Sequence, residues 1–153
     1  MIETPVELVE IEKIRQLKSR YFRFLDTKDW DGLATIFAQD AIFDAKLATV
    51  TSAFEEGDPT WYAEGRENIV SFIRRVVEHR VTVHHGHDHE VRLLSPDHAR
   101  GVVALEDWIW EGSGRDQRLL LHGWGHYSEE YRRDTDGGRL VRSTLTRLNL
   151  ITT

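Results

Sequence analysis

The second half of the chain constrains the fold most, because it consists of long strand-like segments separated by turn signals. Four segments of this kind can be marked, at residues 81–94, 101–110, 118–131 and 139–151. Between the first two lie Pro96 and Asp97, where a turn is expected because proline fixes its own φ and aspartate can bond the backbone ahead of it. Strands joined by short turns predict an antiparallel meander.

The first half of the chain is predicted to be mainly helical. Apolar residues recur with a spacing of about 3.6 over residues 6–25, which indicates an amphipathic helix. The stripe consists of Val6, Val9, Ile14, Leu17, Tyr21, Phe24 and Leu25. Lys28 and Asp29 indicate a break, after which Asp29 can cap a second helix that continues to Phe37. A short strand, a loop and a third helix are expected at residues 41–45, 51–60 and 65–80. Helices followed by a strand meander predict an α+β fold.

Composition narrows the classes of protein to which the chain can belong. With 153 residues the chain has the length of one domain, covering residues 1–153. It contains no cysteine, which excludes disulfide frameworks, thiol nucleophiles and thiolate zinc sites. A formal net charge of −6, without a run of basic residues, argues against a nucleic-acid-binding surface.

The chain also lacks the sequence signals of membrane insertion and export. No apolar stretch approaches the roughly 20 residues needed to cross a bilayer. The acidic first ten residues, MIETPVELVE, lack the apolar core of a secretory signal. We therefore expect a soluble, cytoplasmic protein with neither a membrane nor a nucleic acid as partner.

The strand-like segment at residues 101–110 is apolar on both faces. One parity carries Val103, Leu105 and Ile109, and the other carries Val102, Ala104, Trp108 and Trp110. Antiparallel strands with one wet face normally alternate, so helices should cover one face and a second copy of the chain the other. The alternative is a sheet edge at which Trp108 and Trp110 lie partly exposed. We favour a homo-oligomer.

Tyr21 and Asp26 are the first candidate site residues, because they lie five positions apart near the end of the predicted first helix. On an ideal helix this spacing separates the side chains by about 140°, so both reach one cavity only if the chain changes direction after Asp26. Each residue also has a structural interpretation. Tyr21 is in register with Ile14 and Leu17 and could be a core tyrosine with its hydroxyl at the rim, and Asp26 could be a turn residue.

Histidines cluster in the segment HHGHDHE at residues 84–90, the expected irregular middle of a strand. A histidine can shuttle protons near neutral pH, and since side chains alternate along a strand, either His84 or His85 points inward. A surface cluster without a role is one alternative, and a metal site is another. A metal is disfavoured because its ligands would divide between two faces and their spacing matches no established pattern. The possible ligands are His84, His85, His87, Asp88 and His89.

Asp107 and Arg147 are charged residues within apolar strand-like segments. Asp107 has the parity of Val103 and Leu105, and Arg147 has the parity of Leu145, so both side chains are expected to point inward. A buried charge is costly unless it is paired. We therefore expect either an Asp107–Arg147 bridge that is purely structural or a role in binding the substrate.

The order of elements and two phrases of the sequence resemble the SnoaL-like branch of the nuclear-transport-factor-2-like superfamily. The phrases are RYFRFLDTKDWDGLATIFAQDAIFD and YAEGRENIVSFIRR. The resemblance implies a cone-shaped α+β barrel, in which a strongly bent antiparallel sheet wraps around three helices and leaves a deep pocket. Members include dehydratases, steroid isomerases, polyketide cyclases and small subunits of aromatic dioxygenases, so the fold does not decide the reaction.

By its site residues the chain looks most like the bile-acid 7-alpha-dehydratase family. That resemblance implies catalytic roles for Tyr21, Asp26 and His84, and it selects His84 rather than His85. It also implies that Asp107 and Arg147 bind substrate or shape the site, and it favours a trimer over a dimer. Scytalone dehydratase is similar in its tyrosine, aspartate and first histidine, but this sequence has no evident second pocket histidine and no evident second catalytic tyrosine.

These observations predict a dehydratase that needs no cofactor and no metal. Its substrate would be a small hydrophobic hydroxylated compound, either steroid-like or a polyketide or other aromatic. His84 would act as the base, Asp26 would orient it, and Tyr21 would donate a hydrogen bond to the carbonyl. The alternatives are a ketosteroid-isomerase-like proton shift and a non-catalytic ligand-binding or accessory subunit.

Overall fold

The computed structural model describes residues 4–52 and 54–153. Residues 1–3 of the acidic first segment and Ala53 of the expected loop lie outside the described residues. The helices are α1 (Pro5–Thr27), α2 (Trp30–Ile36) and α3 (Arg66–Val77), with short 3-10 turns η1 (Lys46–Thr49) and η2 (Gly114–Asp116). The strands are β1 (Phe37–Asp44), β2 (Tyr62–Glu64), β3 (Val81–Ser95), β4 (His98–Glu111), β5 (Arg118–Asp134) and β6 (Gly137–Thr152).

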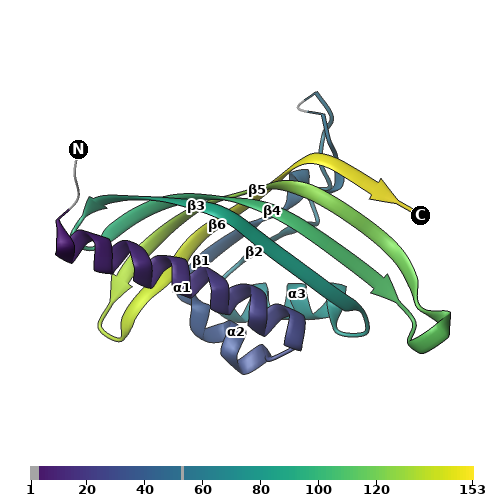
Figure 1. Cartoon of the computed structure of the whole chain (residues 1–153), viewed down its shortest axis with the longest axis horizontal. Coiled ribbons are helices and arrows are strands. Elements are labelled where there is room, and N and C mark those ends of the chain that lie inside the picture. Colours follow the sequence, from purple (N-terminus) through teal and green to yellow (C-terminus); the bar gives the residue numbers. More distant parts are fainter. Residues whose placement is uncertain (1–3, 53) are drawn as a thin grey trace.

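One six-stranded sheet arches over the three helices, which lie together on its inner side (Figure 1). The strand order is β2-β1-β6-β5-β4-β3, with free edges at β2 and β3, so the sheet is not closed into a barrel. This arrangement confirms the predicted α+β cone. No helix of the described ranges is long and apolar enough to span a bilayer.

The sheet is mixed, whereas an antiparallel sheet was expected. Strands β3 to β6 form the predicted antiparallel meander, but β1 pairs with β6 in parallel, for example Phe43 with Ser143. The expectation was wrong at this one pairing because no hairpin joins the two strands. The chain leaves β1, passes through β2, α3 and three further strands, and returns in the same direction as it left.

Helix α1 begins and ends at residues that suit helix termini. Thr4 and Glu7 form a capping box, and Lys28 ends the helix in the left-handed conformation with a φ of 62°. The expected apolar stripe is wrong in its first two turns, because Val6 and Val9 are 72% and 54% exposed. The buried face consists of Ile11, Leu17, Lys18, Tyr21, Phe22 and Leu25.

Strand β3 has the irregular middle that the sequence indicated. Its pairing with β4 shifts between His87 and Glu90, and Asp88 between them has a φ of 44°. A bulge of this kind bends a strand and increases its twist. The bend helps β3 to curve around α1, against which it packs.

The outer face of the sheet carries a band of aromatic and histidine rings that none of the helices in the described residues covers. Trp108 and Trp110 on β4 are half-buried there, while Val103 and Leu105 of the same strand are buried on the inner face. Trp108 stacks on His122 of β5 with ring centroids 4.7 Å apart. The helices therefore cover only one of the two apolar faces predicted for this segment.

Candidate active site

An apolar cavity of about 300 Å³ lies between α1, α3 and the inner face of the sheet. Four of the five candidate residues line it, namely Tyr21, His84, Asp107 and Arg147. Asp26 does not line the cavity and lies behind His84 instead. Most of the remaining wall is apolar and includes Leu25, Phe43, Trp61, Phe72, Val76, Ile109, Leu121 and Leu145.

Asp26 holds His84 through both its backbone and its ring. The Nδ1 atom of His84 lies 2.7 Å from Oδ1 of Asp26, and the backbone N–H of His84 donates to Oδ2 at 2.8 Å. The hydroxyl of Thr82 also donates to Oδ1, at 2.8 Å. Three bonds to one carboxylate fix the imidazole at the cavity wall, where its side chain is only 7% exposed.

The end of α1 explains how Asp26 reaches β3. Asp26 lies in the last turn of α1, which packs against β3, so its side chain reaches Thr82 and His84 at the start of that strand. Lys28 then ends the helix in the left-handed conformation. The Nζ atom of Lys28 donates to the Thr82 hydroxyl at 2.7 Å. Burial lowers the pKa of Lys28, while the nearby Asp26 charge opposes this effect.

The hydrogen bonds of Asp26 determine which ring nitrogen of His84 is free. In the neutral ring Nδ1 carries the hydrogen that is donated to the Asp26 carboxylate, so Nε2 is the nitrogen with the lone pair. Nε2 lies 3.9 Å from Oδ2 of Asp107. The ring of Phe22 lies nearly parallel to the imidazole, at an angle of 14°, and packs against it.

Tyr21 and Tyr127 place two phenol groups in the cavity wall. Both are buried, at 1% and 2% exposure, and their ring centroids lie 5.9 Å apart. Burial raises the pKa of Tyr21 well above its ordinary value, and the neighbouring Tyr127 raises it further. Burial likewise raises the pKa of Tyr127. Both phenols therefore keep their protons near neutral pH.

Tyr127 was missed in the sequence, where no second tyrosine was evident in the pocket. The parity of β5 could have indicated it, because Tyr127 shares the inward-facing parity with Gly123, Gly125 and Tyr131. Leu121 and Tyr127 flank the two glycines along this parity, and both line the cavity. The cavity thus contains one histidine and two tyrosines.

Asp107 and Arg147 form a buried ion pair at the cavity wall, with side chains only 3% and 4% exposed. Nη1 and Nη2 of Arg147 donate to the two carboxylate oxygens at 2.5 and 2.9 Å. Nε of Arg147 donates to the carbonyl oxygen of Ala48 at 3.2 Å. Since the pair also faces the cavity, its geometry is compatible with both a structural and a substrate-binding role.

The remaining histidines of β3 and β5 lie away from this cavity. His85 is exposed on the outer face, where its ring packs edge-on against Trp108 at 5.1 Å. His122 on the same face has Nε2 2.9 Å from Oε1 of Glu106. His84, and not His85, therefore points into the cavity.

Comparison with known proteins supports the assignment of the fold. A family model described as the SnoaL-like domain matches residues 6–144. The structure resembles a candidate scytalone dehydratase from Novosphingobium aromaticivorans DSM 12444 with a TM-score of 0.81 and 17% identity, covering 99% of this chain and 92% of the other.

Two further solved structures show the same fold. A candidate aromatic ring hydroxylase from Novosphingobium aromaticivorans has a TM-score of 0.78 and 24% identity, with 99% and 96% of the two chains covered. A hexachlorocyclohexane dehydrochlorinase of type 2 has a TM-score of 0.74 and 17% identity, with 96% and 90% covered. With a matching model over nearly its whole length, the chain belongs to the family of SnoaL-like domains.

Proposed function

We propose that the chain is a dehydratase that needs no cofactor. The substrate is a small hydrophobic hydroxylated carbonyl compound, steroid-like or a polyketide-derived aromatic, and the reaction eliminates water from the position β, or vinylogously related, to the carbonyl. One observation carries the proposal: the 2.7 Å contact between His84 and Asp26 at the wall of an apolar cavity that also contains Tyr21. The cavity, at about 300 Å³, lies at the lower end of the roughly 300–1,000 Å³ of small-molecule sites.

In the first step His84 takes a proton from the carbon atom next to the carbonyl. Its Nε2 atom carries the lone pair, because Nδ1 donates to Asp26. As the imidazole becomes charged, the Asp26 carboxylate stabilises it through the same hydrogen bond. Positioned bases of this kind typically contribute about 10²–10⁴ in rate.

Tyr21 stabilises the electron pair that the broken C–H bond releases. The pair moves onto the carbonyl oxygen, and the Tyr21 hydroxyl donates a hydrogen bond to the resulting enolate. The raised pKa of the buried phenol ensures that it holds a proton to donate. Tyr127, which lies beside Tyr21, supplies a second donor. Donors arranged in advance in a dry cavity stabilise developing charge more strongly than water does.

The second step restores the starting state of the protein. The enolate electron pair re-forms the carbonyl and a C=C bond, and the C–O bond to the hydroxyl group breaks. The His84 imidazolium returns its proton to the leaving oxygen, so water departs and the base is regenerated. Asp107 and Arg147 shape the cavity, where Oδ2 of Asp107 lies 3.9 Å from Nε2 of His84.

Two structures with the same fold are named for eliminations, which supports this choice of reaction class. One is named as a candidate scytalone dehydratase and the other as a hexachlorocyclohexane dehydrochlorinase. The names describe the removal of water and of hydrogen chloride by those proteins. A base within an apolar cavity is the common requirement of both reactions, and His84 meets it in this chain.

Two substitutions test the proposal directly. Purified wild type, His84→Ala and Tyr21→Phe are incubated with a panel of hydroxylated cyclic ketones and steroid-like thioesters, and the loss of water is measured by mass spectrometry. We expect the rate on a turned-over substrate to fall about 10²–10⁴-fold for His84→Ala. For Tyr21→Phe the rate should fall about 10²–10³-fold, which is the usual cost of removing one hydrogen-bond donor from an oxyanion hole.

The matched controls are His85→Ala and Tyr62→Phe. His85 lies on the opposite face of the same strand, and Tyr62 is bound to Glu64 away from the cavity. Both controls should retain the wild-type rate. Equal activity of His84→Ala and wild type would contradict the proposal. A product of unchanged mass would instead favour an isomerase, and a ligand recovered unaltered in a complex with a larger protein would favour an accessory subunit.

We also propose that the chain forms a homo-oligomer through the outer face of its sheet, with a trimer favoured over a dimer. The argument rests on the ring band there, which includes Trp108, Trp110, His122 and Trp124. An uncovered band of large aromatic side chains is typical of a protein interface. The test is described below.

A further inference from the structure

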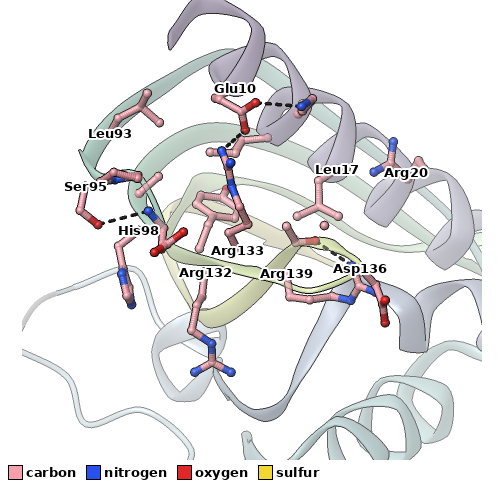
Figure 2. Close-up of a pocket in the computed structure, with 18 residues that line it drawn as sticks. Glu10, Leu17, Arg20, Leu93, Ser95, His98, Arg132, Arg133, Asp136 and Arg139 are labelled. Atoms are coloured by element: carbon pink, nitrogen blue, oxygen red, sulfur yellow. Dashed lines mark hydrogen bonds and ion pairs between the residues drawn. The ribbon is translucent and has the colours of Figure 1, made fainter. Parts of the chain in front are cut away.

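A second hollow, of about 240 Å³, lies beside the N-terminal half of α1 (Figure 2). It is bounded by α1, by the turn between β3 and β4, and by the hairpin between β5 and β6. It shares no lining residue with the cavity that contains His84. The reaction proposed above therefore makes no use of it.

The inner wall of this hollow is apolar. Leu17 and Leu93 lie on it together with the ring of Tyr131. The Tyr131 hydroxyl donates to Glu129, and it lies 3.2 Å from Nε2 of His89. Since the polar end of the tyrosine is held within the protein, its ring is left to form part of the apolar wall.

The rim of the hollow is more basic than acidic. Five basic side chains line it, namely Lys13, Arg20, Arg132, Arg133 and Arg139. Three acidic side chains line it, namely Glu10, Asp97 and Asp136. Five positive and three negative charges leave an excess of two positive charges, in a chain whose formal net charge is −6. Arg132 is paired with Asp40, which does not line the hollow, so one positive charge remains in excess and the hollow is less negative than the protein as a whole.

Two of the guanidinium groups are already neutralised. Arg132 donates to both carboxylate oxygens of Asp40, and Arg133 forms an ion pair with Glu10. These two arginines hold the hairpin in place against β1 and α1. They leave little capacity for a further anion.

The other two arginines lack a carboxylate partner. Across residues 4–52 and 54–153, Arg20 on α1 has no hydrogen-bond or ion-pair partner, and Arg139 on β6 donates only to the carbonyl oxygen of Gly138. Both side chains are half-buried and come from opposite walls of the hollow (Figure 2). A partly desolvated guanidinium without an acceptor gains most from a bound carboxylate, whose two oxygens match its parallel donors.

We propose that this hollow binds a small amphiphilic carboxylate, an organic acid with a short apolar body. The carboxylate lies at the guanidinium groups of Arg20 and Arg139. The apolar body lies on the Leu17 side chain and the Tyr131 ring. A volume of 240 Å³ is below the roughly 300 Å³ at which drug-sized sites begin, which limits the ligand to a single short chain or ring.

Sodium octanoate is a suitable probe, with acetate as the probe without an apolar body and octanol as the probe without a charge. Binding is measured by isothermal titration calorimetry and mapped on the wild-type protein by amide chemical shifts. Octanoate should shift the signals of Leu17, Ala99 and Gly138, which line the hollow. The variant Arg20→Gln/Arg139→Gln should bind octanoate at least tenfold more weakly, since a charge-assisted hydrogen bond contributes about 1.5–3 kcal/mol.

The control variant is Arg115→Gln, because Arg115 is exposed in η2 and does not line the hollow. It should bind octanoate like wild type. The proposal is overturned if octanoate fails to bind, if octanol or acetate binds as tightly, or if the double variant binds unchanged. It is also overturned if the shifts are confined to residues around His84. None of these outcomes depends on the dehydratase activity.

Discussion

Asp107 on β4 and Arg147 on β6 meet across β5 directly above Gly123, where a methyl group would lie 2.7 Å from the carboxylate and 2.5 Å from the guanidinium. The absence of a side chain on the middle strand is what allows residues of the two outer strands to bond each other. The glycine therefore serves the site through the space that it leaves and not through its backbone freedom.

Replacement of Gly123 by alanine should force the ion pair apart. We expect a loss of about 1–3 kcal/mol in the free energy of unfolding, the usual cost of overpacking a buried site. Urea denaturation measures it. Gly138→Ala is the matched control, because a methyl group there meets nothing within 4 Å. Equal stability of Gly123→Ala and wild type would show that the pair is not held in this geometry.

The two roles open to the Asp107–Arg147 pair can be separated by single and double substitutions. Arg147→Met alone should lower the free energy of unfolding by about 3–5 kcal/mol, because it leaves the Asp107 charge buried and unpaired. Asp107→Leu/Arg147→Met should recover most of this loss, since apolar residues of similar volume often replace a buried pair at little cost. If the stable double variant also keeps wild-type turnover, the pair is only structural. Loss of turnover with stability restored supports the substrate-binding role.

Asp26→Asn should impair catalysis while leaving the fold intact. The amide can no longer stabilise a charged imidazole, and it presents a donor where His84 needs an acceptor. We expect kcat/KM to fall about 10²–10⁴-fold on any substrate that wild type converts. Asp31→Asn, at an exposed position on α2, should not change the rate. A full rate for Asp26→Asn would mean that the hydrogen bond to His84 is structural.

Much of the fold followed from local patterns in the sequence. Turn residues marked the ends of the meander strands, and strand parity placed Asp107 and Arg147 on the inner face because the side-chain period of a strand is two. The break at Lys28 was also visible, and it ends α1 two residues after Asp26. These features depend on residues close together in the sequence.

The features that were missed depend on residues far apart. The parallel pairing of β1 with β6 is set by the path of the whole chain. Lys18 has the charge of a surface residue, yet it is 3% exposed because Glu129, 111 positions away, accepts from it at 2.6 Å. The Lys18 ammonium also lies 3.6 Å from the ring centroid of Tyr127 and 4.0 Å from that of Tyr21, so it packs behind both phenols of the cavity.

His89 should make the stability of the protein depend on pH in the mildly acidic range. Burial lowers the pKa of His89, whereas the unfolded chain titrates near pH 6.5. Below about pH 6.5 the unfolded state therefore binds more protons than the folded state, and the free energy of unfolding falls as the pH falls. The slope is at most about 1.4 kcal/mol per pH unit and less for a ring that is partly solvated.

Urea midpoints measured between about pH 5 and 7.5 test this expectation. His89→Gln should flatten the profile, because it removes the group that gains a proton on unfolding. His79→Gln, at a side chain that is 90% exposed, should leave the profile unchanged. A wild-type profile that does not bend below pH 6.5 would contradict the expectation, as would one that keeps its slope in His89→Gln.

The outer face of the sheet should control self-association. Light scattering coupled to size exclusion should give wild type the mass of an oligomer, with a trimer favoured. Trp124→Glu should yield a folded monomer, because it places a charge in the ring band of β4 and β5, 4.0 Å from the His122 ring in wild type. Phe54→Glu is the control, because it also replaces an aromatic side chain with a carboxylate, but at a fully exposed position in a loop. A monomeric wild type would show that this interface does not form. Loss of association in Phe54→Glu but not in Trp124→Glu would place the interface elsewhere.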